Sequence, residues 1–178
     1  PYSPEVHQII QEGIFGSQPP PAGTDPMRFA YPPFVILPIA PLLSLRFDWA
    51  ISAWFSLNLL ILMICTRYAF PKMPLWMLVI LPLSYPFAIG LALGNFSVLV
   101  FAILIACLGS QLTHKNPSSL VQICLGAGLA WTLAKPQISW FFVAFLILYA
   151  LLLKRKAFLI AWAGGLAGMV GFSFAVLP

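Results

Sequence analysis

Three polar residues beside long apolar runs could take part in chemistry: Asn95, Lys135 and Gln137. Asn95 precedes the apolar run that opens at Phe96, so its side chain can cap a helix there. Lys135 is followed by Pro136, which suits the first turn of a helix because its missing N–H costs nothing at that position. Lysines and helix N-termini both attract anions. We therefore predict that these residues surround a single phosphate group.

Two of these residues also have an ordinary structural interpretation. Asn95 can be a plain N-cap, with the preceding Gly94 supplying a backbone angle that other residues rarely adopt. Lys135 can extend its ammonium to lipid headgroups without binding a substrate. The sequence leaves both interpretations open.

No metal site, disulfide or other cofactor site is predicted. His7 and His114 are isolated in the sequence. Cys65, Cys107 and Cys124 each lie inside an apolar run without CxxC spacing, so we interpret them as small core residues.

The composition excludes a water-soluble fold. Hydrophobic residues make up 61% of the chain and charged residues 7%, against about 25% charged in a soluble domain. The apolar runs approach the roughly 20 residues that a helix needs to cross a bilayer, and they lack the alternation of barrel strands. The sequence therefore predicts an all-α polytopic membrane bundle with six transmembrane helices, at residues 49–65, 74–90, 96–112, 119–133, 138–153 and 157–177.

The segment before these runs divides in two. Residues 1–32 are polar and rich in proline, and we predict that they are the remnant of an extracytoplasmic loop before a transmembrane domain at 33–178. Residues 33–45 are apolar, but as a helix they would reach only about 20 Å of a core of roughly 30 Å. Pro38 and Pro41 also weaken a continuous helix. We therefore expect an interfacial or re-entrant helix there.

Basic residues predict the orientation, because lysine and arginine near helix ends stay in the cytoplasm. The cluster at 154–156 is placed inside. Counting back along the spans puts loop 67–72 and His114 inside, and the turns at Asn95 and Lys135 outside. A lysine outside runs against the bias, which favours a binding role for Lys135.

Three separated elements carry a resemblance to a known family. They are Tyr-Pro-Pro at 31–33, Gly-Asn at 94–95 within ALGNFSVLVFAIL, and Lys-Pro at 135–136 within LAWTLAKPQISWFFVAFLILYALLLKRK. With these elements in order over nearly its whole length, the chain resembles glycosyltransferase family 87. That family is related to bacterial polyprenyl-phosphate-mannose-dependent α-mannosyltransferases of the membrane GT-C class. The second element departs from the commoner Gly-Gln form.

The resemblance implies a hexosyltransferase of the cytoplasmic membrane. It would transfer a hexose, expected to be mannose, from a polyprenyl-phosphate sugar to a hydroxyl of a lipid or glycan acceptor, with inversion, at the extracytoplasmic face. Its partners would be that donor, the acceptor and membrane lipids, with no nucleic acid. No metal is required, because nearby cations can stabilise a single lipid phosphate as it departs.

The resemblance also assigns roles to residues. A carboxylate in the first outer loop of such enzymes acts as general base. We expect that base to lie upstream of this chain, which would leave the fragment inactive alone, and Asp25 is the internal candidate. The substrate-binding candidates are Lys135 and then Arg28 for the phosphate, with Tyr31, Asn95 and Gln137 for hydrogen bonds to sugar or phosphate.

Two other classes of function were weighed. A transporter or lipid flippase would carry charges in the middle of its helices or inverted repeats, and the sequence has neither. A non-catalytic membrane scaffold would explain the small-residue spacing from Gly164 to Gly168. It would not explain polar residues gathered around an outer lysine.

Overall fold

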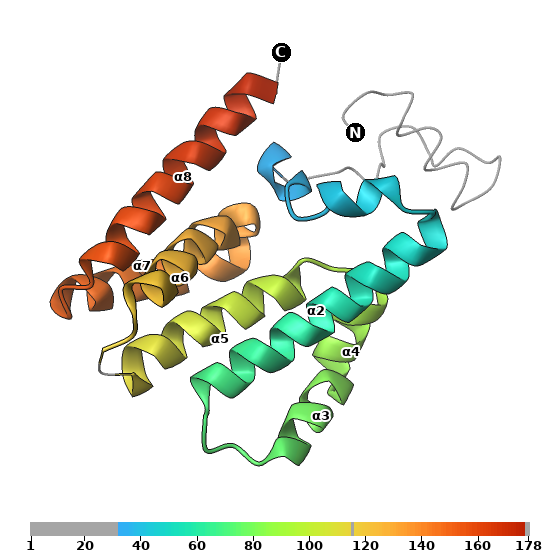
Figure 1. The fold of residues 1–178 in the computed structure, drawn as a ribbon, viewed down its shortest axis with the longest axis horizontal. Helices are drawn as coiled ribbons and strands as arrows, with labels where there is room; N and C mark the ends of the chain where they lie inside the picture. Colours follow the sequence, from blue (N-terminus) through green and yellow to red (C-terminus); the bar gives the residue numbers. More distant parts are fainter. Residues whose placement is uncertain (1–31, 115, 177–178) are drawn as a thin grey trace. The chain divides into compact units, whose positions relative to one another are not determined.

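The computed structural model describes residues 32–114 and 116–176, and all regular structure there is helical (Figure 1). The predicted all-α class is confirmed for these residues. The α-helices are α2 (Phe47–Ala69), α3 (Leu75–Leu83), α4 (Tyr85–Ala92), α5 (Ser97–Thr113), α6 (Ser119–Trp131), α7 (Pro136–Leu152) and α8 (Lys156–Val176). Three short 3-10 helices accompany them: η1 (Pro33–Ile36), η2 (Ala40–Ser44) and η3 (Thr132–Ala134).

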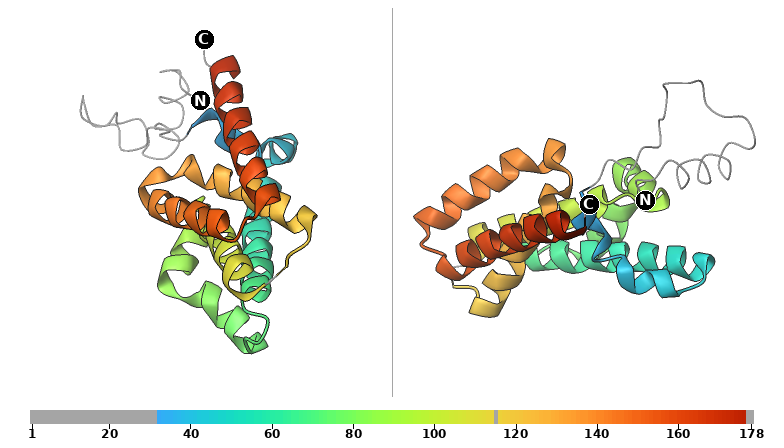
Figure 2. Two further views of the ribbon diagram at one scale, coloured as in Figure 1. Left: turned by 90° about the vertical axis from the view of Figure 1, so that its left-hand side faces the viewer. Right: turned by 90° about the horizontal axis from the view of Figure 1, so that it is seen from above.

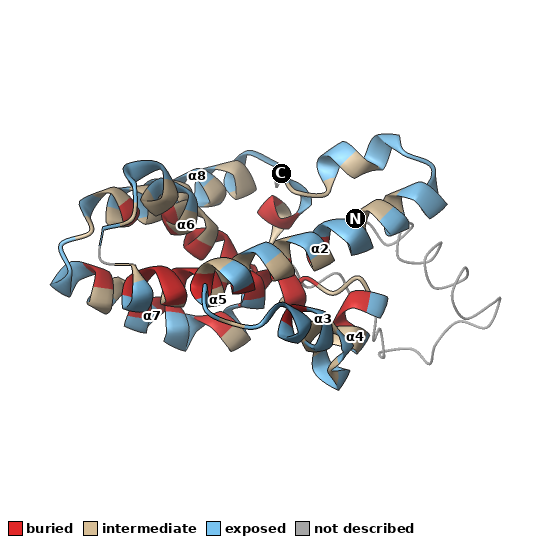
Figure 3. Cartoon of the chain, turned by 60° about the horizontal axis from the view of Figure 1, so that its bottom comes forward, coloured by how far each residue is buried: buried red, intermediate tan, exposed pale blue. Residues whose placement is uncertain are grey.

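Helix α5 is the central element of the described chain. Ten of its 17 residues are buried, whereas α8 buries only Phe158. Helices α2, α4, α6 and α7 all pack against α5, and Figure 3 shows the buried residues concentrated along it. Leu62 of α2 and Leu91 of α4 meet Val98 and Ala102 of α5 in one apolar cluster. The first turn of α5 is thus held firmly by its neighbours.

Glycines allow the two closest helix crossings. A Cβ atom added to Gly109 of α5 would lie 2.3 Å from the Cα of Ala69 in α2. A Cβ atom on Gly126 of α6 would lie 2.3 Å from the carbonyl oxygen of Phe158 in α8. Helices α6 and α8 run beside each other, as the views in Figures 1 and 2 agree. Glycine is required at both crossings because any side chain would push the backbones apart.

The predicted helix at 74–90 is bent rather than continuous. Helices α3 and α4 meet at a 65° angle, with Ser84 between them in an extended conformation. In a continuous helix Pro86 could not donate to the carbonyl of Pro82, and its ring would clash with that carbonyl. The chain therefore breaks at Ser84, whose N–H and hydroxyl both donate to the Leu81 carbonyl.

Two described helices, α2 and α8, are long and apolar enough to cross a membrane, and the bent pair α3–α4 gives a third if it counts as one span. Helices α5, α6 and α7 are apolar but shorter. At 1.5 Å per residue, 17 residues reach about 26 Å of a roughly 30 Å core. Length and composition therefore support a membrane protein with two to three candidate spans, and the count of six stays a prediction.

The segment at 33–45 forms the two short 3-10 helices η1 and η2 instead of one helix. Pro41 lies in the first turn of η2, where a missing N–H is tolerated. Phe34 and Val35 of η1 are buried, and η1 packs against α8. Most of η2 is exposed. The interfacial or re-entrant position of this segment stays a prediction.

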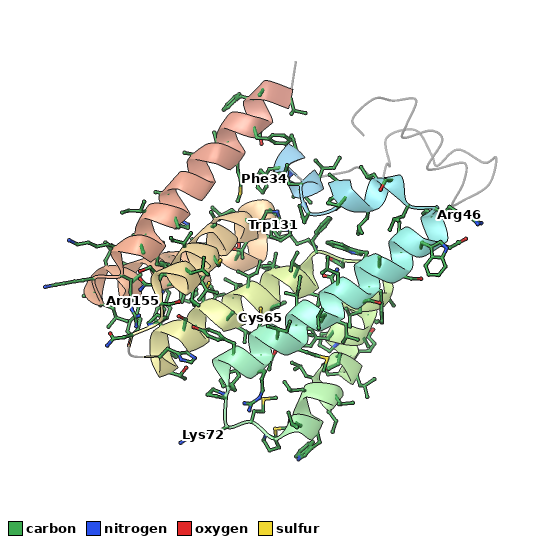
Figure 4. All side chains as sticks on the ribbon, viewed as in Figure 1. Phe34, Arg46, Cys65, Lys72, Trp131 and Arg155 are labelled. Atoms are coloured by element: carbon green, nitrogen blue, oxygen red, sulfur yellow. The ribbon has the colours of Figure 1, made fainter. Side chains whose placement is uncertain are left out.

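The loops at the C-terminal end of α5 contact one another. At its C-terminal end the ring of His114 stacks on that of Tyr68, with centroids 4.5 Å apart, and its Nε2 lies 3.1 Å from the Tyr68 carbonyl. Arg155 donates a 2.8 Å hydrogen bond to the carbonyl of His114. The loops that follow α2, α5 and α7 therefore meet at the C-terminal end of α5. In Figure 4 the label Arg155 lies near this end and the label Trp131 lies near the opposite end.

Candidate phosphate site at the start of helix α5

The turn from α4 to α5 is a Schellman motif with Gly94 in the left-handed conformation, at φ 61°. The Asn95 N–H donates to the Gly90 carbonyl at 2.8 Å, and the Gly94 N–H donates to the Leu91 carbonyl at 3.0 Å. These bonds satisfy carbonyls that the end of α4 would leave unpaired. The unusual backbone angle predicted for Gly94 is confirmed, and Asn95 is the residue that closes this turn with its N–H.

The side chain of Asn95 organises the first turn of α5. Its Oδ1 atom accepts hydrogen bonds from the backbone N–H and the hydroxyl of Ser97, both at 3.0 Å. An Asn oxygen that accepts from a backbone N–H two residues on provides one of the partners that a helix start lacks. Asn95 thus performs the capping function, although the residue that immediately precedes α5 is Phe96.

Lys135 reaches the same point from the connection between α6 and α7. The 3-10 turn η3 and the 3.1 Å bond from the Lys135 N–H to the Thr132 carbonyl hold its backbone. Its carbonyl accepts from the N–H and hydroxyl of Ser139, so Lys135 is also the N-cap residue of α7. Its Nζ donates to Asn95 Oδ1 and, at 2.9 Å, to Ser97 Oγ.

The ammonium of Lys135 is therefore fixed at the N-terminus of α5. The lysine side chain is only 8% exposed, and a hydrogen bond to each of two residues limits its rotation. The N-terminus of an α-helix carries a partial positive charge, which adds to the charge of the ammonium. An ammonium and a helix N-terminus are both features that attract anions.

Aromatic rings pack beside the turn that carries Asn95. The Trp54 indole N–H donates to the Gly94 carbonyl at 3.0 Å, and its ring meets Phe96 edge to face at 5.3 Å between centroids. Phe96 packs against Trp131 at 5.9 Å. The indole N–H of Trp131 is buried, and no described residue accepts a hydrogen bond from it. Trp131 is labelled in Figure 4, at the end of α6.

The structure brings together two of the residues singled out from the sequence, Asn95 and Lys135. Gln137 is exposed on the first turn of α7, and its side chain makes no hydrogen bond to another described residue. Asp25, Arg28 and Tyr31 lie outside the described residues.

Sequence reasoning missed Ser97, Trp54 and Trp131. Ser97 carried the clearest signal, because a hydroxyl two residues after Asn95 falls in the first helical turn. Trp131 lies one helical turn before Lys135, but in an apolar run an aromatic residue has many possible roles. Trp54 joins the site through a contact 40 residues away in sequence, which no local pattern predicts.

Comparison with known protein families matches residues 29–178 to glycosyltransferase family 87. The chain belongs to glycosyltransferase family 87. No curated protein and no solved structure matches it. Membership of family 87 identifies a glycosyltransferase, which acts on a sugar donor and an acceptor. The match includes the Tyr-Pro-Pro motif and both turns that form the candidate site, whereas Asp25 and Arg28 precede it.

Proposed function

We propose that this family 87 chain is part of a GT-C-type membrane hexosyltransferase whose donor is a polyprenyl-phosphate sugar, with mannose as the expected sugar. The observation that carries the proposal is the buried ammonium of Lys135, held by Asn95 and Ser97 at the first turn of α5. The part of such a donor that this cation would bind is its phosphodiester monoanion, which gains a second negative charge as the lipid phosphate leaves the sugar.

The proposed site suits the charge that develops during transfer. When the bond between the anomeric carbon and the phosphate oxygen breaks, its electron pair moves to the phosphate. A fixed cation and a helix N-terminus stabilise that charge without reorganising during the reaction. The acceptor hydroxyl bonds to the opposite face of the anomeric carbon and gives its proton to a general base, so the configuration inverts.

We place the general base outside the described residues. The four acidic residues are Glu5, Glu12, Asp25 and Asp48, and of these only Asp48 is described. Asp48 is exposed in the first turn of α2, where a negative charge stabilises the helix dipole. Asp25 stays the internal candidate, and a carboxylate of the first outer loop is the one that the family resemblance favours.

The arrangement of loops supports an extracytoplasmic site in the cytoplasmic membrane. Tyr68, next to Arg67 near the end of α2, and Arg155, between Lys154 and Lys156, both contact His114 at the C-terminal end of α5, and basic residues near helix ends favour the cytoplasm. Asn95 and Lys135 lie at the N-terminal end of the same helix. If α5 crosses the membrane, as the six-span topology requires, the proposed phosphate site faces outward.

The test is sugar transfer by the intact protein in membranes, with radiolabelled polyprenyl-phosphate mannose. Lys135→Met keeps the apolar stem of the side chain but removes the charge, and we expect kcat/KM to fall about 100-fold or more. Lys156→Met changes an exposed lysine at the other end of α5, and Asp25→Asn tests the internal acid. Both should stay within about twofold of the wild type.

Full activity of Lys135→Met would show that the lysine is only a headgroup anchor. Absence of transfer by the wild type, with mannose and with other polyprenyl-phosphate hexoses, would reject the donor class. The thermal unfolding midpoint of each variant must be measured in parallel, so that a misfolded protein is not mistaken for an inactive one.

A further inference from the structure

An apolar groove of about 550 Å³ lies next to the candidate phosphate site. It is formed by η2, the first half of α2, the end of α4 and the turn that precedes α5. Its lining consists of aliphatic and aromatic side chains and one glycine. Leu42 lines it from η2, Ala50 from α2, and Leu93 from the turn after α4. The volume lies within the range of about 300–1,000 Å³ that is usual for small-molecule sites.

The groove and the phosphate site share a wall. Gly94 and Phe96 both line the groove, and they flank Asn95, whose side chain holds the Lys135 ammonium. Trp54 lines the groove as well and donates to the Gly94 carbonyl. An apolar compartment therefore ends one residue from a fixed cation. That combination suits an amphiphile with an anionic head and an apolar chain.

We propose that the groove binds the isoprenoid chain of the lipid-phosphate donor, at the units that follow the phosphate. This inference rests on the proposed function, because it takes the donor phosphate to lie at Lys135. The phosphate stays attached to its lipid throughout the reaction, so the first isoprene units must enter whatever apolar space begins beside Lys135. The groove begins there, since Gly94 and Phe96 belong to the same turn as Asn95.

Direct binding tests the groove without sugar transfer. The probe is a polyprenyl phosphate without sugar, with a photoreactive diazirine in one of its first isoprene units, added to the intact protein in detergent. We expect label on α2 within residues 47–55 or at the end of α4 within residues 91–96. Excess unlabelled polyprenyl phosphate should remove the label, and an equal concentration of phosphatidylglycerol should not.

Substitutions in the groove give the matched controls. Ala50→Phe fills the groove from α2 and should reduce labelling about tenfold. Ser56→Phe adds the same ring to an exposed position of α2 outside the groove, and should leave labelling unchanged. If Ala50→Phe fails to fold, Leu43→Ser removes a lining side chain that is 67% exposed, and should lower labelling about threefold. Leu120→Ser, at an exposed position of α6, is its control.

Several results would overturn the groove assignment. Equal competition by phosphatidylglycerol would make it an ordinary lipid cleft. Label only on residues outside the groove would mean that the lipid chain binds at another place in the protein. No label at all would mean that the polyprenyl phosphate does not bind. Unchanged labelling in both Ala50→Phe and Leu43→Ser would likewise exclude it.

Kinetics separate this inference from the proposed function. With a long-chain donor, Ala50→Phe should raise KM about tenfold and leave kcat unchanged, whereas a donor whose phosphate carries a methyl group in place of the isoprenoid chain should show no difference. Groove labelling without transfer from any donor would keep the groove and reject the proposed reaction. Transfer that ignores chain length, without groove labelling, would keep the reaction and reject the groove.

Discussion

The ammonium of Lys135 donates a hydrogen bond to the side-chain oxygen of Asn95, 40 residues earlier in the chain. That oxygen also accepts from the backbone N–H of Ser97. One amide oxygen thus positions both the first turn of α5 and the cation beside it. The interpretations of Asn95 as a helix cap and as part of an anion site are therefore compatible.

Replacing Asn95 by Asp separates these two roles. The carboxylate can still accept from Ser97, and it gains an ion pair with Lys135, so the thermal unfolding midpoint should stay the same or rise. The added negative charge should weaken phosphate binding, so kcat/KM for the lipid-phosphate donor should fall about tenfold or more. Donor kinetics and thermal unfolding of the same preparation check both.

Asn95→Ala is the control for this prediction. It removes the cap as well as the lysine contact, so it should lower stability by about 1 kcal/mol and also reduce activity. Wild-type activity in Asn95→Asp would mean that Asn95 has only a structural role.

The turn after α7 is a Schellman motif like the one after α4, with Lys154 in the place of Gly94. Substitutions at these two positions should have opposite effects on stability. Gly94→Ala puts a Cβ atom at φ 61° and should cost about 1–2 kcal/mol. Lys154 adopts φ 55° in the turn after α7, where the Arg155 N–H donates to the Ala150 carbonyl at 2.9 Å. Lys154→Gly should therefore stabilise the protein by about 1 kcal/mol. Unfolding midpoints that shift in the same direction for both variants would contradict the assignment.

The crossing of α2 and α5 predicts a strong effect of a single methyl group. Gly109→Ala would place Cβ 2.3 Å from the Ala69 Cα, so the helices must separate, at a cost of about 1–3 kcal/mol. Gly168→Ala on α8 meets nothing within 4 Å and should raise helix stability by up to about 1 kcal/mol. Thermal unfolding of the two variants should separate them clearly, and equal midpoints would disprove the close crossing.

Single cysteines test the proposed orientation. In a variant with Cys65, Cys107 and Cys124 replaced by Ala, the exposed residues Gln137 and Lys72 are each changed to Cys. A membrane-impermeant maleimide should label Gln137→Cys on intact cells, but Lys72→Cys only after permeabilisation. The reverse pattern would place the phosphate site in the cytoplasm.

Much of the fold could be predicted from the sequence, because a run of apolar residues and the polar residues that flank it determine where a membrane helix begins and ends. The predicted run at 96–112 became α5 (Ser97–Thr113) and that at 138–153 became α7 (Pro136–Leu152). The break at Ser84 was missed, because both arms are apolar and hydropathy does not register a change of direction. Pro82 and Pro86 were the available signal.

The candidate site was only partly predictable. The alternation of the spans placed the turns at Asn95 and Lys135 on one side of the bundle, and the structure joins their side chains. The participation of Trp54 and Ser97 depends on how α2 packs and how the first turn of α5 closes. Gln137 lies in the first turn of α7 with an exposed side chain, whereas Lys135 precedes that helix with φ −127° and ψ 74°, so helical spacing does not bring the two side chains together.

The 65° break between α3 and α4 makes the position of Asn95, which follows the far end of α4, depend on the angle at Ser84. A helix of eight residues reaches about 12 Å, so a tilt of about 10° at Ser84 would shift its far end, and Asn95 with it, by about 2 Å. A shift of that size exceeds the tolerance of a hydrogen bond. The prolines on either side of Ser84 would then act at a distance, by setting the angle at which the asparagine reaches the lysine.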